Sequence, residues 1–349
     1  MKNITITTLL FLFSFSIFGQ TNTEKLPTFY DQLEGNKVVS VDMISDGVGP
    51  IVIYTTFNQN DVKCKQWDGQ EWVTFGTFPK FDNRGTVVIA KNKKQFYALV
   101  QNEKTWSILT KKGESWKVLG TLSGADDLST PTLTFIDEVP VVYEVHYRNS
   151  TVMAHTFKGG KFINISSTLE GLGKVKSDFV MLGKKENHMI LAYTSYDKNS
   201  LELFEINQDG TETNQKTITK GLKTKDIGTI SSMFYSKGKL HLIYAGKDDL
   251  YKHFTYNESS EKWEEVAQGK ESHSGLGLYM AADLSFVSKY FDNDLPVFYK
   301  YNGTNWDAGI ELGSIKIYQG ETVKLAEALG EYYLLNDTAK DGYVIQKIN

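Results

Sequence analysis

Short apolar stretches recur along the chain, and several of them run into a tight turn followed by a strand that opens with a large aromatic residue. Each stretch is about five to eight residues long, which is typical of a β-strand. The turns carry glycine or asparagine, and the aromatic positions after them are Trp72, Trp116, Phe162, Trp263 and Trp306. Between Phe162 and Trp263 the spacing doubles, and the turn Asp209-Gly210 followed by Thr213 fills the gap. This pattern predicts repeats of about 40 to 50 residues.

Seven copies of an apolar strand precede these turns, at 50–57, 95–100, 140–147, 189–195, 240–246, 284–291 and 331–336. Another β-rich run lies before each copy, so every repeat contains four strands. A twisted four-stranded sheet cannot bury both of its faces unless other sheets pack on each side. We therefore predict an all-β fold, a seven-bladed β-propeller of four-stranded antiparallel blades. A six-bladed ring is one alternative, since the fourth repeat lacks its aromatic residue and the strand at 284–291 is weakly patterned. A pair of β-sandwiches whose repeats are similar by accident is the other.

The last repeat is incomplete, because no fourth strand follows its third strand at 342–349. The segment 29–35 precedes the first full repeat, and Tyr30 and Leu33 match the aromatic-x-x-apolar spacing of Trp72 and Phe75. We therefore predict that this N-terminal segment supplies the outer strand of the last blade, with Tyr30 as its aromatic anchor. Such a strand closes the ring and leaves no open sheet edge.

Residues 1–20 have the pattern of a secretory signal peptide, with Lys2, an apolar run from Leu9 to Phe18 and the small residue Gly19. The run is too short to cross a bilayer. We expect cleavage near Gly19–Thr21, no membrane insertion, and a secreted or periplasmic protein whose single propeller domain covers 21–349. Cys64 is the only cysteine, so no disulfide can form within the chain, and a buried, inert thiol is expected.

Composition restricts the partners. The formal net charge is −4 at pH 7, and arginine occurs only at Arg84 and Arg148, which argues against nucleic acid as a partner. The six histidines show no metal-binding spacing. Acidic pairs such as Asp292 and Asp294 lie in predicted loops, where such residues commonly form turns. We expect no cofactor and no metal, assign no catalytic residue, and predict a monomer.

The end of four repeats, a glycine followed three positions later by a large aromatic residue, resembles the second half of the Asp-box turn of sialidase-like propellers. The matching pairs are Gly69/Trp72, Gly113/Trp116, Gly159/Phe162 and Gly303/Trp306. The aspartate of that motif is missing, because its place is taken by Trp67, Lys111, Phe157 and Tyr301. Along nearly its whole length the chain is similar to secreted bacterial propellers and propeller lectins, which implies the architecture. Sialidase activity is not implied, because holding the substrate carboxylate needs an arginine cluster.

Candidate ligand-binding residues lie in the predicted loops between second and third strands, on the face of a propeller that commonly binds ligands. They are Tyr147, Arg148, Asn149, Tyr196, Asp197, Asp248, Tyr290, Asp292 and Asn293. Aromatic rings beside amides and carboxylates suit a sugar, and they equally suit a hydrated protein interface. We therefore predict a binding or scaffolding protein for a glycan or an extracellular protein. The same residue types are common in turns, and a polysaccharide-acting hydrolase or lyase is the alternative function.

Overall fold

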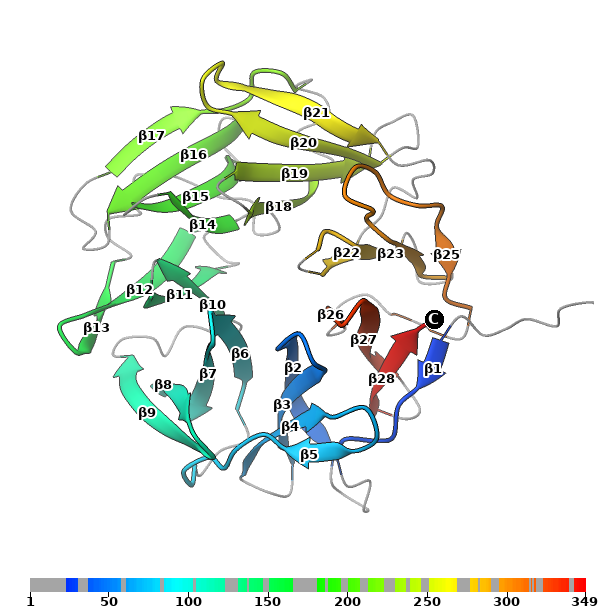
Figure 1. Cartoon of the computed structure of the whole chain (residues 1–349). Helices are drawn as coiled ribbons and strands as arrows, with labels where there is room; N and C mark the ends of the chain where they lie inside the picture. The colour runs from blue at the N-terminus through cyan, green and yellow to red at the C-terminus, as the bar shows by residue number, and fades with distance from the viewer. Residues whose placement is uncertain are drawn as a thin grey trace, which may run out of the picture.

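Seven four-stranded sheets form a ring in the computed structural model of the chain (Figure 1). The structure describes residues 23–30, 37–57, 61–81, 85–102, 105–122, 131–136, 138–146, 151–165, 181–185, 188–195, 200–207, 213–222, 230–236, 239–245, 251–268, 277–281, 283–289, 295–313, 315, 317, 323–338 and 342–349. Within these residues every element is a strand. The predicted seven-bladed, all-β architecture is confirmed, and the six-bladed and β-sandwich alternatives are wrong.

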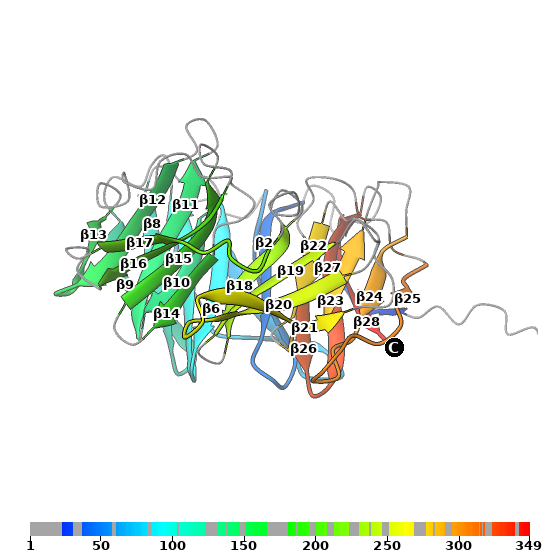
Figure 2. The ribbon, with the colours of Figure 1, turned by 90° about the horizontal axis from the view of Figure 1, so that it is seen from above.

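Each blade contains four strands, ordered from the centre of the ring to its rim. Figure 2 shows the ring edge-on, between its two faces. Blades 1 to 3 contain β2 (Val38–Ser45), β3 (Pro50–Thr56), β4 (Val62–Trp67) and β5 (Trp72–Thr74); β6 (Val87–Asn92), β7 (Gln95–Asn102), β8 (Thr105–Lys112) and β9 (Ser115–Leu122); and β10 (Thr132–Ile136), β11 (Val139–His146), β12 (Thr151–Lys158) and β13 (Lys161–Asn164).

The remaining blades repeat the arrangement. Blades 4 to 6 contain β14 (Met181–Lys185), β15 (His188–Ser195), β16 (Ser200–Asn207) and β17 (Thr213–Thr217); β18 (Ile230–Ser236), β19 (Lys239–Ala245), β20 (Tyr251–Asn257) and β21 (Lys262–Gln268); and β22 (Gly277–Met280), β23 (Phe286–Lys289), β24 (Val297–Tyr299) and β25 (Ile310–Glu311). Blade 7 contains β26 (Val323–Ala328), β27 (Glu331–Thr338) and β28 (Gly342–Ile348), with β1 (Thr23–Lys25) as its outer strand.

An N-terminal strand closes the ring, as predicted, but the residues that form it were predicted wrongly. β1 pairs antiparallel with β28, with Thr23 opposite Ile348, and the N–H of Leu26 donates to the carbonyl of Ile345 at 2.9 Å. Other blades make the same bond three residues beyond the anchor, as from Phe75 to Cys64. Thr23 and Leu26 therefore hold the positions that were predicted for Tyr30 and Leu33.

Tyr30 has a different role, in the core between blades 7 and 1. The ring centroids of Phe29 and Tyr30 lie 4.9 Å apart, and Phe29 also packs edge-on against Tyr54. The hydroxyl of Tyr54 donates to the carbonyl of Phe29 at 3.1 Å. Because these aromatic side chains fill the space beside the closing strand, the anchor position itself can hold a threonine.

Strand β3 shows why the sequence folds into packed blades. Its seven residues are all buried, because alternate side chains of a strand point to opposite faces of the sheet. Ile51 and Ile53 face blade 2, whereas Val52 and Tyr54 face blade 7. A continuous apolar run is therefore stabilised on both faces, and each buried side chain of this size contributes about 1.5–3 kcal/mol.

The aromatic anchors connect each outer strand to the blade before it. The indole N–H of Trp116 donates to the carbonyl of Phe75 at 3.1 Å, and that of Trp263 donates to Ile218 at 2.6 Å. Trp72 makes the equivalent bond to Pro27, just beyond the closing strand, at 2.7 Å. These residues pack between blades, as their register in the sequence predicts.

Two repeats depart from this pattern. In blade 4 the N–H of Ile218 donates to the carbonyl of Leu201, which places Gln215 at the anchor position instead of the predicted Thr213. In blade 6 the indole N–H of Trp306 donates to the carbonyl of Leu284 in its own blade, at 2.9 Å. Trp306 still reaches the preceding blade, because its ring packs against His253.

Candidate ligand-binding site at the channel mouth

The ligand-binding residues predicted from the sequence lie outside the described residues: Tyr147, Arg148, Asn149, Tyr196, Asp197, Asp248, Tyr290, Asp292 and Asn293. In the chain they fall between β11 and β12, β15 and β16, β19 and β20, and β23 and β24. They stay a prediction. In blade 2 the end of the second strand lies beside the start of the inner strand, since the N–H of Gln101 donates to the carbonyl of Thr86. We call this face of the ring the upper face.

A cavity of about 590 Å³, the upper cavity, lies where the inner strands β2, β6 and β10 begin. Its polar lining residues come from four blades and are Ser40, Asp42, Thr86, Gln101, Thr132, Lys324 and Tyr343. Valine, isoleucine and leucine side chains alternate with them along the strands. The volume is in the range of about 300–1,000 Å³ that is usual for small-ligand sites.

Side chains of β2 accept hydrogen bonds from backbone N–H groups on the channel-facing edge of β6. The hydroxyl oxygen of Ser40 accepts the N–H of Val87 at 3.1 Å, and the carboxylate of Asp42 accepts the N–H of Ile89 at 3.0 Å. Residues two apart on one strand thus meet residues two apart on the next, which shows that the two inner strands run in the same direction. These bonds fix the wall of the upper cavity between blades 1 and 2.

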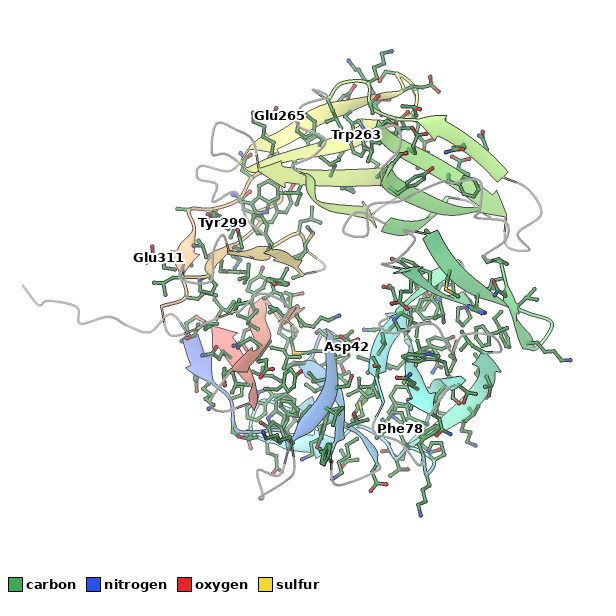
Figure 3. The ribbon with its side chains drawn as sticks, turned by 180° about the vertical axis from the view of Figure 1, so that it is seen from behind. Asp42, Phe78, Trp263, Glu265, Tyr299 and Glu311 are labelled. Carbon is green, nitrogen blue, oxygen red and sulfur yellow. The ribbon has the colours of Figure 1, made fainter. Side chains whose placement is uncertain are left out.

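An ion pair crosses from blade 7 to blade 1 beside this wall. The ammonium nitrogen of Lys324 lies 2.9 Å from Oδ1 of Asp42. Asp42 is on the inner strand of blade 1, beside the central channel (Figure 3). The charge of Asp42 raises the pKa of Lys324, so the ammonium stays protonated at neutral pH. The Asp42 side chain is 7% exposed and that of Lys324 is 47% exposed.

A second cavity of about 730 Å³ lies at the opposite, lower end of the inner strands, and Lys324 lines both cavities. Several polar groups of this lower cavity already make hydrogen bonds within the protein. Lys91 donates to the carbonyl of Asp46 at 2.8 Å, the Asp46 carboxylate accepts the side-chain amide of Gln66, and Glu327 accepts the N–H of Gly330. Groups of the upper cavity also make internal bonds, since Gln101 accepts the N–H of Thr86. The upper cavity is the better candidate for a polar ligand because more hydroxyl and amide side chains line it.

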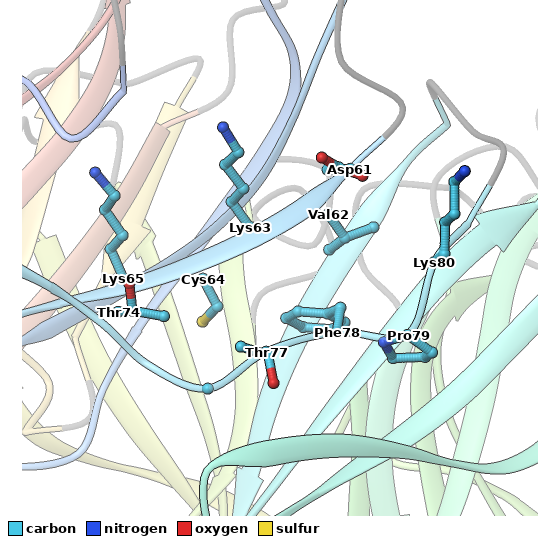
Figure 4. A pocket seen from close by; sticks show the side chains of 11 residues that line it. Asp61, Val62, Lys63, Cys64, Lys65, Thr74, Thr77, Phe78, Pro79 and Lys80 are labelled. Carbon is cyan, nitrogen blue, oxygen red and sulfur yellow. The ribbon is translucent and has the colours of Figure 1, made fainter.

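A groove of about 380 Å³ on the rim runs between β4 and residues 76–80 (Figure 4). The ring of Phe78 stacks on Trp116 with centroids 4.8 Å apart, and the Cys64 thiol lies between β4 and this segment. Lys63 and Lys65 point to the other side of β4 from Cys64 (Figure 4). Cys64 is buried, and burial raises the pKa of its thiol. The predicted burial of the thiol is confirmed, and its inertness stays a prediction.

Two histidines, His155 and His253, are buried, and His253 packs against Trp306 of the next blade. His253 Nε2 lies 2.8 Å from Nδ1 of His241. Burial and the charge of His241 lower the pKa of His253 to about 4. No group of three or more His, Cys, Asp or Glu side chains that could hold a metal ion occurs within the described residues.

The described part of the chain has no helix with the length and apolar character needed to span a membrane.

The sequence gives little indication of the upper cavity. Serine and threonine at the start of a β-strand are ordinary residues, and no motif connects Asp42 with Lys324. Their partnership depends on ring closure, which brings the inner strands of blades 1 and 7 together. The alternation of apolar and polar residues in 39–43 is the only local signal, and half-buried strands commonly show it.

Comparison with known proteins defines the class of the fold. No family model matches the chain, and no curated protein matches its sequence. Among solved structures, YCF48 from Cyanidioschyzon merolae is 12% identical with a TM-score of 0.53, covering 94% of this chain and 98% of that one. Virginiamycin B lyase from Staphylococcus aureus is 11% identical with a TM-score of 0.53, covering 94% and 99%.

A lectin is also similar. Aleuria aurantia lectin, solved with α-methyl-L-fucoside, is 11% identical with a TM-score of 0.39, covering 93% of this chain and 96% of that one. At such low identities the resemblance is one of fold. The chain is a seven-bladed β-propeller.

Proposed function

We propose that this propeller is a binding protein that takes a glycan in the upper cavity. The observation that supports the proposal is the convergence of hydroxyl and amide groups from four blades, represented by Ser40, Thr86, Gln101, Thr132 and Tyr343. Each of these groups donates and accepts hydrogen bonds, as the hydroxyls of a sugar do. Tyr343 and the neighbouring valines add apolar surface against which the C–H faces of a sugar ring can pack.

The charged groups of the cavity favour recognition over hydrolysis. Glycoside hydrolysis needs two converging carboxylates, and among the described lining residues Asp42 is the single carboxylate. It is occupied by the N–H of Ile89 and the ammonium of Lys324. The proposal includes export of the chain after removal of residues 1–20, as the sequence predicts.

A glycan array probed with the purified chain lacking residues 1–20 tests the proposal. Tyr343→Phe and Thr132→Val each remove one hydroxyl from the upper cavity and keep the shape of the side chain. We expect each to weaken the binding of the identified glycan by about two- to tenfold, the effect of one lost hydrogen bond.

Tyr279→Phe is the matched control, because Tyr279 lines the lower cavity. It should leave the affinity unchanged. Absence of binding across a broad array, or equal losses in all three variants, would contradict the proposed function.

A further inference from the structure

We propose that the glycan bound in the upper cavity carries a carboxylate, as a hexuronate residue does, and that the ammonium group of Lys324 binds it. This inference rests on the proposed function, because it names the charged group of the same ligand. The observation behind it is the arrangement of the ion pair, in which the negative partner is buried and the positive partner is half exposed.

The carboxylate of Asp42 is buried and is bonded to groups of the protein. Its carboxylate accepts the backbone N–H groups of Ile89 and Met43, at 3.0 and 2.9 Å, in addition to the Lys324 ammonium. Three donors thus surround one side chain that is 7% exposed. An incoming ligand therefore meets little of this negative charge.

The side chain of Lys324, which carries the positive charge, is partly exposed to solvent. Its side chain is 47% exposed, and no further ion pair or hydrogen bond joins it to the described residues. An ammonium group has three N–H donors, so donors remain after the contact with Asp42. Lys324 lines the upper cavity as well as the lower one, so a ligand bound in the upper cavity contacts this residue.

The groups around Lys324 suit one carboxylate better than a cluster of negative charges. Lys324 is the single cation among the described lining residues of the upper cavity, and apart from its partner Asp42 the other polar groups there are hydroxyls and an amide. The oxygen of Ser40 accepts the N–H of Val87, so its proton is available for donation to a ligand. One charge-assisted bond supported by neutral donors matches a sugar acid, which carries one carboxylate and several hydroxyls.

The experiment uses oligomers of polygalacturonate, alginate and glucuronan, each paired with its carboxyl-reduced, neutral counterpart. Affinities are measured by isothermal titration at low and at high salt. We expect at least one acidic oligomer to bind about tenfold more tightly than its neutral counterpart at low salt, with the preference reduced at high salt. Lys324→Met should abolish the preference, and Lys324→Arg should retain most of it.

Two further variants distinguish the loss of the Lys324 charge at the site from a loss of folding stability. Lys324→Met leaves the Asp42 charge buried and unpaired, which is costly, so Asp42→Asn is combined with it to remove that charge and keep an acceptor for Ile89. The matched control is Lys91→Met, which removes a lysine from the lower cavity and should leave the preference intact.

The outcomes separate the two proposals. Equal binding of acidic and neutral oligomers would overturn the role of Lys324 and leave glycan binding standing. A preference that persists in the double variant, or binding of sulfated neutral glycans in place of the uronates, would also overturn the assignment of a carboxylate to Lys324. If no glycan bound and the glycan array were silent as well, the proposed function would fail together with this inference.

Discussion

The backbone N–H of Leu26 lies 2.9 Å from the carbonyl oxygen of Ile345, and this bond fastens the N-terminal strand to the last strand of the ring. Leu26 is buried in the core between blades 7 and 1 with Tyr333 and Ile345. We expect Leu26→Ala to lower the free energy of unfolding by about 2–4 kcal/mol, the usual cost of a cavity at a buried leucine. Chemical denaturation measures it.

The exposed neighbour Glu24 offers the control for this prediction. Glu24→Ala should change the free energy of unfolding by less than about 0.5 kcal/mol. If both variants were equally stable, the packing of the closing strand would contribute nothing to the ring.

The partly buried indole bond from Trp116 to Phe75 should cost more to remove than the exposed bond from Trp72 to Pro27. Trp116 is 2% exposed and its N–H donates to Phe75, whereas the bond from Trp72 to Pro27 is solvent-exposed. Trp116→Phe leaves a carbonyl without its donor, so we expect a loss of about 1–3 kcal/mol in the free energy of unfolding. Trp72→Phe should lose less, because water can replace the donor. Thermal and chemical denaturation compare the two variants, and a larger loss for Trp72→Phe would argue against this account.

Two glycines with similar positive φ angles should respond differently to alanine. Gly221 has a φ of +95° and Gly303 a φ of +97°, so both substitutions carry about 1 kcal/mol or more of left-handed strain. A Cβ at Gly221 would collide with the carbonyl oxygen of Trp263, whereas a Cβ at Gly303 meets open space. We expect a clearly lower melting temperature for Gly221→Ala than for Gly303→Ala. Similar melting temperatures would mean that residue 221 can move away from Trp263 at little cost.

The pair His241 and His253 predicts a loss of stability in mild acid. The pKa of His253 is lowered from 6.5 to about 4 in the folded chain, so the unfolded chain takes up a proton that the folded chain does not. The stabilisation from neutral His253 is therefore complete above about pH 6.5 and is lost as the pH falls towards 4. His253→Gln should flatten the dependence of the melting temperature on pH between these values. An unchanged pH profile would show that His253 titrates normally.

The blades could be predicted because the information is local. The turn-and-aromatic repeat and the apolar strands recur in each unit, and a four-stranded unit has few ways to bury both faces. The closing strand was predicted at the wrong residues because Tyr30 and Leu33 match the aromatic-x-x-apolar spacing by chance. The true positions, Thr23 and Leu26, lack the aromatic signal, since Phe29 and Tyr30 supply the aromatic packing from farther along the chain.

The candidate site depends on contacts between distant parts of the sequence. Asp42 and Lys324 lie in the first and last blades, and their chemistry is visible only after the ring is closed. Residues such as Ser40 and Thr132 carry no pattern that separates a cavity wall from an ordinary strand. The loop residues named from the sequence, including Tyr147 and Tyr196, lie outside the described residues and still await a test.

The hydrogen bonds that Ser40 and Asp42 accept from the backbone N–H groups of Val87 and Ile89 also limit the kind of ligand that the channel can bind. An extended peptide captured by β-augmentation needs free main-chain donors on a sheet edge, and at these two positions the donors are taken. Selectivity along this wall must then come from side chains alone. Substitution of a few side chains could therefore change the ligand that is bound, without disturbing the hydrogen bonds between β2 and β6.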